Sequence, residues 1–285
     1  ASTGHQPSGH DQSFLSKHNI HPVVFAFGCL FVVFVLYQLV AGTLTFLIVG
    51  TGQITRSNVM QVRLLTMAGQ ILFILVPPVF LARLLSRQTA TVFPWRVPKI
   101  QETFFASASL LLLQQVFQVY LFFQDRVPIP EALRKILAPT KEMMEALFRN
   151  LVKAEGLPEL MIVILVVAVV PAAVEELFFR GLIQSSFEKT VPPVWAAVLV
   201  GIIFGLYHFN PFALIPLIGL GSFFGFLRFR SNSILVAMTA HFLNNAMAVL
   251  AVYFSVEDKM LLGADKTVEP SLTGVVAQLF VYLML

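Results

Sequence analysis

The chain has 285 residues, of which 57% are hydrophobic and only 12% are charged. Soluble domains carry roughly twice that charged fraction, so the composition excludes an ordinary soluble protein and indicates a protein embedded in a lipid bilayer. The net charge of +4 does not indicate a nucleic-acid-binding protein, because the basic residues are spread over the polar connections, as in membrane proteins whose topology they help to set.

Residues 1–21 are predicted to form a polar N-terminal tail. They lack the positively charged region that opens a signal peptide. The histidines of this segment do not have the regular spacing of a metal site, so we expect a solvated tail: His5, His10, His18 and His21. Because the chain begins without Met and ends inside an apolar run, we expect the natural protein to extend at one or both ends.

Apolar segments of membrane-spanning length recur along the rest of the chain. A helix of about 20 residues crosses the hydrocarbon core of a bilayer. The segments cover residues 22–50, 58–85, 102–124, 157–187, 192–209, 211–229 and 233–255, and an eighth begins near residue 271. We therefore predict an all-α, polytopic membrane protein with about eight transmembrane helices, divided into N-terminal helices (22–130) and a C-terminal core (157–285).

Residues 131–156 differ from these segments because charged and apolar residues are mixed there at helical spacing. Met144, Leu147 and Leu151 fall on one face, which predicts an amphipathic helix that lies on the membrane or caps the bundle. Pro139 is expected to break or kink this helix, because proline removes an internal hydrogen bond. A plain solvated linker is the alternative.

The basic residues of the loops predict the orientation of the chain, since cytoplasmic loops are enriched in Lys and Arg. The loop after the second segment carries Arg83, Arg87, Arg96 and Lys99, and the loop after the sixth carries Arg228 and Arg230. With eight spans, both loops lie on the side of the N-terminal tail, and the acidic loop after the seventh segment lies opposite. We therefore expect a protein of the inner cell membrane with a cytoplasmic N-terminus, although the basic residues of 131–156 would then lie outside.

Polar residues interrupt the apolar segments of the C-terminal half. They are Glu175, Glu176 and Arg180, then His208, then His241, and finally Asn245 beside Asn244. A charge at bilayer depth is costly and by default marks a functional site. The alternative is structural, because a Glu–Arg pair or a histidine inside a membrane can serve only to hold helices together.

Helical spacing places these residues at similar depths. The chain turns back near Pro192, so Glu175 lies about 16 residues before the turn and His208 about 16 residues after it. At about 1.5 Å per residue, this puts both side chains at the same depth on antiparallel helices. His241 lies about ten residues into the seventh segment, and Asn245 follows one helical turn later on the same face. The helices therefore direct Glu, His, His and Asn side chains into one polar pocket.

The two neighbouring glutamates are expected to have different surroundings. Glu176 and Arg180 have the i, i+4 spacing of an ion pair on one helical face. Glu175 is rotated from that pair by about 100° and need not share the arginine, which makes its carboxylate suited to taking a proton from water. Pro171 cannot donate a backbone hydrogen bond to the carbonyl of Val167, so the helix is expected to loosen next to Glu175.

Three motifs formed by these residues resemble those of a known family. EELFFR (175–180) fits Glu-Glu-x-x-x-Arg, FGLYH (204–208) fits Phe-x-x-x-His, and HFLNN (241–245) fits His-x-x-x-Asn. In this order and spacing they resemble the CAAX prenyl protease and bacteriocin-processing family of intramembrane proteases, whose eukaryotic members include the type II CAAX prenyl endopeptidase. The resemblance covers about residues 157–255, and the N-terminal half carries no matching motif.

The resemblance implies eight membrane helices around a catalytic chamber that opens toward the cytosol, with 157–285 as the catalytic core. It implies that Glu175 is the general base that activates water, and that His208 positions this water or shares its proton. His241 and Asn245 would bind the oxyanion of the tetrahedral intermediate. The supporting residues would be Glu176, Arg180 and Phe204.

The sequence leaves open whether the reaction needs a metal. The family has long been described as metalloproteases, and Glu175, His208 and His241 could ligate zinc with water as the fourth ligand. A His-Glu-x-x-His motif is absent, and the three residues come from separate helices. We therefore expect a metal-free mechanism without a cofactor, with the zinc-dependent form as the alternative.

These features predict an intramembrane endopeptidase. Its expected substrate is a prenylated C-terminal tail, a bacteriocin leader or another membrane-anchored peptide. A non-catalytic immunity or scaffold protein is one alternative, although Glu175 and His208 are both present. A transporter is another, but the repeat symmetry that is typical of transporters is not evident.

Two further patterns concern helix packing. GLGSFFG (219–225) places small residues in an apolar segment and predicts a close approach of two helices. Polar residues also occur in the N-terminal spans, where they either line the cavity or bridge helices, and the sequence does not choose between these roles: Gln70, Gln114, Gln115 and Gln118.

Overall fold

The computed structural model describes residues 13–50 and 54–254, and these residues form helices and connecting turns without a β-strand. Within these ranges six helical segments are long and apolar enough to cross a membrane: Pro22–Val49, Val59–Leu85, Ile100–Gln124, Leu157–Phe187, Leu214–Ser231 and Ile234–Tyr253. The chain is therefore an integral, multi-pass membrane protein of the all-α class. The eighth predicted segment lies outside the described residues.

Several spans combine α-helices with π-helical turns, which are labelled η. The first span is α2 (Pro22–Phe34), η1 (Val35–Ala41) and α3 (Gly42–Val49), and the second is α4 (Val59–Gly69), η2 (Gln70–Leu75) and α5 (Val76–Leu85). The fourth is α9 (Leu157–Ile164), η3 (Leu165–Val169), α10 (Val170–Glu175), η4 (Glu176–Ile183) and α11 (Gln184–Phe187). The remaining helices are α1 (Phe14–Lys17), α6 (Thr89–Val92), α7 (Ile100–Gln124), α8 (Glu131–Val152), α12 (Pro193–Tyr207), α13 (Leu214–Ser231) and α14 (Ile234–Tyr253).

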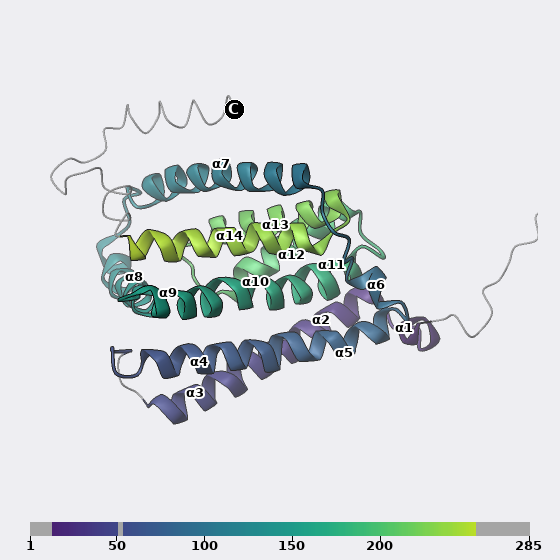
Figure 1. Cartoon of the computed structure of the whole chain (residues 1–285), viewed down its shortest axis with the longest axis horizontal. Helices are drawn as coiled ribbons and strands as arrows, with labels where there is room; N and C mark the ends of the chain where they lie inside the picture. Colours follow the sequence, from purple (N-terminus) through teal and green to yellow (C-terminus); the bar gives the residue numbers. More distant parts are fainter. Residues whose placement is uncertain (1–12, 51–53, 255–285) are drawn as a thin grey trace, which may run out of the picture.

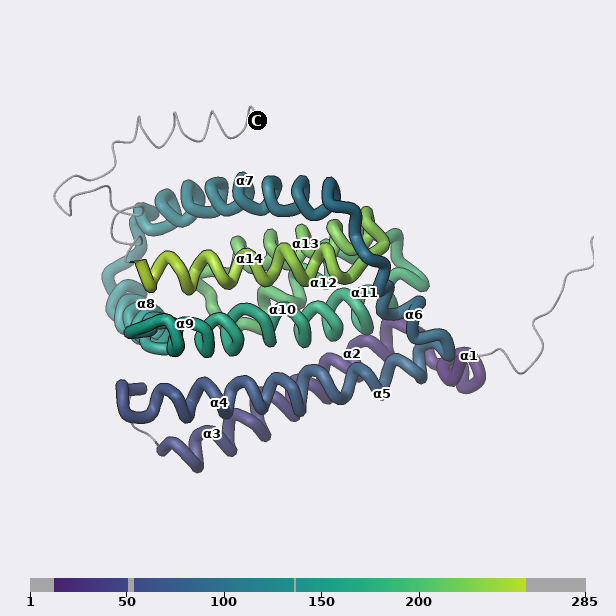
Figure 2. Tube along the Cα trace, viewed as in Figure 1, coloured from purple at the N-terminus to yellow at the C-terminus, as the bar shows by residue number. Residues whose placement is uncertain are grey.

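The spans form a bundle whose core surrounds the fourth span. In Figure 1 the first two spans lie along the bottom of the bundle, α7 lies along the top, and the fourth span lies between them with α14. The trace in Figure 2 follows the same path, with α12 and α13 behind α14. The largest core cluster contains Phe178 and Ile183 of the fourth span, together with Leu30 of α2, Leu85 of α5 and Val200 of α12.

Part of the predicted polar tail packs on this core. The side chain of Ser13 caps α1 by accepting a hydrogen bond from the N–H of Ser16 at 3.3 Å. Leu15 is buried in the same cluster as Leu85. The rest of the tail, including His5 and His10, lies outside the described residues.

α12 and α13 form a closely packed hairpin because small residues face one another across it. A Cβ added to Gly201 would lie 2.4 Å from the backbone N of Ser222, and one added to Gly221 would lie 2.9 Å from the Cα of Gly201. A Cβ added to Gly225 would lie 3.0 Å from the Cβ of Ala197. The close packing predicted from GLGSFFG is therefore confirmed.

The fifth predicted segment is shorter than a full span, which corrects the prediction over 192–209. α12 has 15 residues, and at about 1.5 Å per residue it extends about 22 Å, less than the roughly 30 Å of a hydrocarbon core. It ends at Tyr207, and Phe209 then adopts a positive φ of 48° before Pro211. His208 is the C-cap residue of α12 and lies at a helix end, not inside a helix as predicted.

The loops that are predicted to share one side of the membrane meet at one end of the bundle. Arg96 Nε donates to the carbonyl of Ser231 at 3.0 Å, and the N–H of Ile234 donates to the carbonyl of Pro94 at 2.9 Å. α1 packs against α5 at this same end (Figure 1). The loops after the second and sixth spans and the start of the first span therefore lie together.

The predicted helix within 131–156 is confirmed as α8, which lies across the opposite end of the bundle and is seen end-on in Figure 1. Buried Arg63 of α4 holds its C-terminus, because Nε donates to the carbonyl of Leu151 at 2.8 Å and Nη2 donates to the carbonyl of Lys153 at 2.6 Å. Arg63 Nη1 also binds Glu159 of α9 at 2.7 Å. These bonds satisfy carbonyls that the last turn of a helix leaves without a partner.

α8 runs continuously through Pro139, so of the predicted break or kink the break is wrong, and the kink stays a prediction. Proline removes the hydrogen bond to the carbonyl four residues earlier, that of Lys135. Pro139 and Lys135 both lie on an exposed part of α8.

Candidate active site

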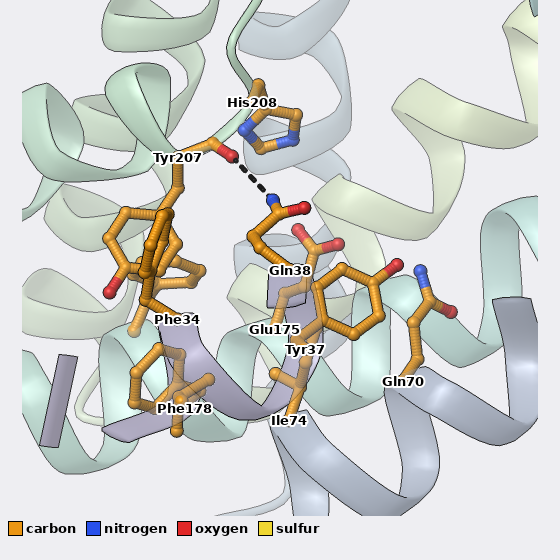
Figure 3. A pocket seen from close by; sticks show the side chains of 11 residues that line it. Phe34, Tyr37, Gln38, Gln70, Ile74, Glu175, Phe178, Tyr207 and His208 are labelled. Carbon is orange, nitrogen blue, oxygen red and sulfur yellow. Dashed lines mark hydrogen bonds between the residues drawn. The ribbon is translucent and has the colours of Figure 1, made fainter. Parts of the chain in front are cut away.

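A cavity of about 330 Å³ lies between the first, second and fourth spans and the end of α12. Its lining mixes apolar and polar side chains: Val33, Phe34, Tyr37, Gln38, Gln70, Ile74, Glu175, Phe178, Phe179, Tyr207 and His208. Figure 3 shows Glu175 and Gln38 in the middle of this pocket, with His208 at its upper edge. A concave, largely apolar site with a few polar groups is typical of a ligand or substrate pocket.

Glu175 is the acidic side chain of this cavity. It is the last residue of α10 and stands directly before the π-helical turn η4. Its Oε2 is buried and has no hydrogen-bond partner among the residues that the structure describes. The Nε2 of His241 lies 4.0 Å from this oxygen, which is beyond hydrogen-bond distance. Glu175 therefore keeps an acceptor atom for a ligand in the cavity.

Glu176 follows directly but does not line the cavity. Its Oε1 accepts hydrogen bonds from Arg180 Nη1 at 2.9 Å and from His241 Nδ1 at 2.8 Å. Arg180 Nη2 donates to the carbonyl of Gly221 in α13 at 2.8 Å. The predicted i, i+4 ion pair is therefore present, and it joins η4, α13 and α14 through buried charges that are paired and hydrogen-bonded.

Phe204 contacts both histidines and the buried arginine. Its ring centroid lies 4.5 Å from that of His208 and 5.9 Å from that of His241. The Cζ of Arg180 lies 4.6 Å from the same ring, a distance at which a cation is attracted to an aromatic face. His208 Nδ1 lies 2.7 Å from the carbonyl of Phe204, and as a donor to that oxygen it leaves Nε2 as the acceptor.

Asn245 belongs to a row of side-chain amides next to the cavity. Its Nδ2 donates to the carbonyl of Val167 at 3.0 Å, and its Oδ1 accepts from Asn244 Nδ2 at 3.0 Å. Gln114 of α7 donates in turn to Asn244 Oδ1. The carbonyl of Val167 is the one that Pro171 leaves without a backbone donor, and the π-helical turn η3 includes it. The predicted loosening of the helix is thus present, and Asn245 supplies the missing donor.

The structure brings only some of the predicted site residues into the cavity itself. Glu175 and His208 line it, whereas His241 and Asn245 are not among its lining residues. His241 is buried next to both glutamates, and Asn245 is directed to the fourth span.

Residues 157–247 match a family model described as type II CAAX prenyl endopeptidase Rce1-like. This segment of the chain is similar to the Rce1-like family. It carries the three motifs, and the resemblance stated from them is thereby confirmed. No curated protein and no solved structure matches the chain. The Rce1-like match supports a protease of the CAAX type embedded in the membrane.

The Rce1-like segment forms only part of the cavity. Tyr37 and Gln38 come from η1 and Gln70 comes from η2, which belong to the first two spans. The sequence analysis missed Tyr37 and Gln38, although a polar pair in the middle of the apolar run 22–50 was an available signal. Of the glutamines whose role the sequence leaves open, Gln70 lines the cavity and Gln114 bridges two helices.

The zinc ligands considered for the Rce1-like segment do not gather into a metal site. Across residues 13–50 and 54–254, no three His, Cys, Asp or Glu side chains are grouped so that they could hold a metal ion. Glu175 and His241 approach one another, but His208 directs its Nδ1 to the carbonyl of Phe204. As these side chains lie in the structure, Glu175, His208 and His241 do not form a zinc site.

Proposed function

We propose that this chain is an intramembrane endopeptidase in which Glu175 activates the water that hydrolyses a peptide bond. The observation that carries the proposal is the difference between two adjacent carboxylates. Both carboxylates have a buried Oε2 without a hydrogen-bond partner in the described part of the chain, but only Glu175 lines the cavity, whereas Glu176 is held by Arg180 and His241 through its Oε1. A general base needs an acceptor atom at the cavity that is not already hydrogen-bonded within the protein.

In the proposed reaction, the substrate carbonyl lies in the cavity beside Glu175. Glu175 takes a proton from water while the water oxygen attacks the carbonyl carbon, and a tetrahedral oxyanion forms. The C–N bond then breaks, Glu175 returns its proton to the leaving nitrogen, and a new carboxyl group and a new amine result. His208, which lines the same cavity, would position the water or share its proton.

His241 and Asn245 are the proposed donors to the oxyanion. His241 Nδ1 lies 2.8 Å from Glu176 Oε1, and its Nε2, which faces Glu175, would donate to the oxyanion. Asn245 Nδ2 already donates to the carbonyl of Val167, so its second N–H would serve after the side chain turns toward the substrate. In this arrangement His241 needs less rearrangement than Asn245 to donate, because one N–H of Asn245 is already used.

The surroundings of the cavity support a membrane-anchored peptide as the substrate. A second, apolar cavity of about 470 Å³ adjoins the first and shares Phe34 and Tyr207 with it. Such a chamber would accept an apolar side chain or a lipid chain attached to the peptide. A prenylated peptide is therefore the favoured substrate, with the bilayer as the other partner and no nucleic acid.

The proposed location is the inner cell membrane, with the N-terminus and the basic end of the bundle in the cytoplasm. The test uses a Cys29→Ser background with a single new cysteine, Gln88→Cys at the basic end or Glu142→Cys on α8, and a membrane-impermeant maleimide on intact cells. Only Glu142→Cys is expected to react before the cells are opened. The reverse labelling pattern would invert the topology and leave the catalytic proposal untouched.

The catalytic proposal is tested with purified protein and quenched-fluorescent peptides, some of them farnesylated, with and without a zinc chelator. The variants are Glu175→Gln, His208→Ala and the control Glu155→Gln, in which the changed carboxylate is exposed beside Arg56 at the α8 end of the bundle. Losing a general base is expected to lower the rate by about 10²- to 10⁴-fold. Glu155→Gln is expected to retain the wild-type rate.

Each outcome has a distinct meaning. Activity that is lost in Glu175→Gln and retained with the chelator supports the metal-free mechanism. Loss with the chelator and recovery with zinc would establish the zinc-dependent alternative. Undiminished cleavage by Glu175→Gln would overturn the assignment of the base. A folded wild-type protein that cleaves none of the peptides would favour an immunity or scaffold protein.

A further inference from the structure

The first two spans present polar side chains to the cavity that the proposed reaction does not use: Tyr37, Gln38 and Gln70. They lie in the π-helical turns η1 and η2. Such turns interrupt the regular helix and often occur at functional sites. Polar groups within a membrane span are costly unless they find partners, so an atom among them that has no partner in the protein is a candidate for contact with a ligand.

The two glutamines differ in how their amide groups are used. Gln38 Nε2 donates to the carbonyl of Tyr207 at 3.5 Å (Figure 3). Gln70 is only 7% exposed, yet its Oε1 has no hydrogen-bond partner among the described residues. Buried amide oxygens are normally hydrogen-bonded. Among the polar side chains that the first two spans present to the cavity, Gln70 therefore has a buried acceptor atom, Oε1, that lacks a donor.

Close packing between the first two spans fixes the position of Gln70. A Cβ added to the preceding Gly69 would lie 3.2 Å from the Cβ of Ala41 and 3.5 Å from the ring of Tyr37. In Figure 3 the hydroxyl of Tyr37 points toward the amide of Gln70. Gln70 thus lines the same cavity as Glu175 while the adjacent backbone is held against the first span.

We propose that Gln70 is a substrate-positioning residue whose Oε1 accepts a hydrogen bond from a backbone N–H of the bound peptide. Every peptide unit that is not part of proline carries an N–H donor, and at membrane depth this donor must find an acceptor within the protein. The inference rests on the proposed function. It places a subsite for peptide backbone on the first two spans, outside the segment 157–247 that matches the family model.

The test compares Gln70→Met with the control Gln61→Met. Methionine keeps the length of the glutamine side chain and removes its hydrogen-bonding atoms. Gln61 is an exposed residue of the same span. A set of peptides, each with one backbone N–H replaced by an ester oxygen, is cleaved by wild type and both variants. The affinities of the same peptides are then measured by fluorescence polarisation for the Glu175→Gln protein, alone and combined with Gln70→Met or Gln61→Met.

The expected result is one ester position at which wild type and Gln61→Met lose roughly tenfold in kcat/KM or affinity, which is the size of one net hydrogen bond. With the all-amide peptide, Gln70→Met should show a kcat/KM or affinity about tenfold lower than wild type. Replacing the amide by that ester should cause no further loss in Gln70→Met.

If the ester still lowers the kcat/KM or affinity of Gln70→Met tenfold, the inference is overturned and the endopeptidase proposal is left intact. A Gln70→Met variant that matches wild type on every peptide would overturn it as well, as expected if water satisfies Oε1. If the ester effect on affinity disappears in Gln70→Met but the wild type cleaves no peptide, the result would support the subsite and refute the peptidase. Neither binding nor cleavage of any peptide by wild type would overturn both.

Discussion

The buried ion pair allows a quantitative prediction for Arg180→Met. The side chains of Arg180 and Glu176 are both fully buried, their N···O distance is 2.9 Å, and Arg180 also binds the carbonyl of Gly221. Breaking a buried ion pair by removing one partner costs roughly 3–5 kcal/mol. We expect a loss of unfolding free energy near the lower limit, about 3 kcal/mol, because His241 still binds the stranded carboxylate.

A second substitution tests whether the stranded charge is the cause. Glu176→Gln alone strands Arg180 and is expected to be destabilising as well. The double variant Arg180→Met with Glu176→Gln contains neither charge, and its amide can still accept a hydrogen bond from His241. It should therefore recover more than half of the loss seen in Arg180→Met, because replacing both buried charges costs less than isolating one.

The assay is unfolding in dodecyl maltoside micelles with increasing SDS, followed by far-ultraviolet circular dichroism and extrapolated linearly to zero SDS. Arg230→Met is the matched control, since Arg230 is exposed at the end of α13. A loss of less than about 0.5 kcal/mol in Arg180→Met, which is the range of ordinary surface changes, would refute the reasoning. A double variant as unstable as Arg180→Met would refute the role of the stranded charge.

Three further predictions concern packing and the α8 end of the bundle. Gly201→Ala should lower the unfolding free energy by about 1–3 kcal/mol, because the added Cβ meets the facing backbone at 2.4 Å, whereas Gly28→Ala, with nothing within 4 Å, should be neutral or stabilising by up to about 1 kcal/mol. Arg63→Met should speed amide hydrogen exchange in the last turn of α8, measured by mass spectrometry, because its donors bind carbonyls there, and the more exposed Arg56→Met should have little effect. Lys141→Met removes an exposed ion pair and should change the unfolding free energy by less than about 1 kcal/mol.

Opposite results would be informative in each case. Equal stability of Gly201→Ala and Gly28→Ala would show that the α12–α13 hairpin is less closely packed than described. Unchanged exchange at the end of α8 in Arg63→Met would show that other contacts hold this helix. A loss of several kcal/mol in Lys141→Met would show that its ion pair is shielded from solvent.

The sequence predicted most of the membrane architecture because the bilayer imposes a length and a composition on each span. Six of the predicted segments correspond closely to Pro22–Val49, Val59–Leu85, Ile100–Gln124, Leu157–Phe187, Leu214–Ser231 and Ile234–Tyr253. The fifth segment was as apolar as the others, yet its helix stops at Tyr207. Composition alone does not mark this end, because the next apolar helix begins only a few residues later and the two hydrophobic runs read as almost continuous.

The sequence also determined which residues could form a site, since charges and histidines stand out against an apolar background and i, i+4 spacing is a local property of a helix. The pairing of Glu176 with Arg180 followed from that spacing. Arg180 also donates to the carbonyl of Gly221, which belongs to another helix, and no pattern in the sequence predicts this hydrogen bond.

Only the tertiary structure decided which side of the fourth span faces a cavity and which polar residues of the first two spans reach it. Tyr37, Gln38 and Gln70 are far from the motifs along the chain. They join Glu175 at one cavity because η1 packs against η2 and η2 packs against the fourth span. Local patterns fix helices because backbone hydrogen bonds and lipid contact act within a segment. A cavity depends on the rotation and crossing of several helices at once, which side-chain packing between distant segments determines.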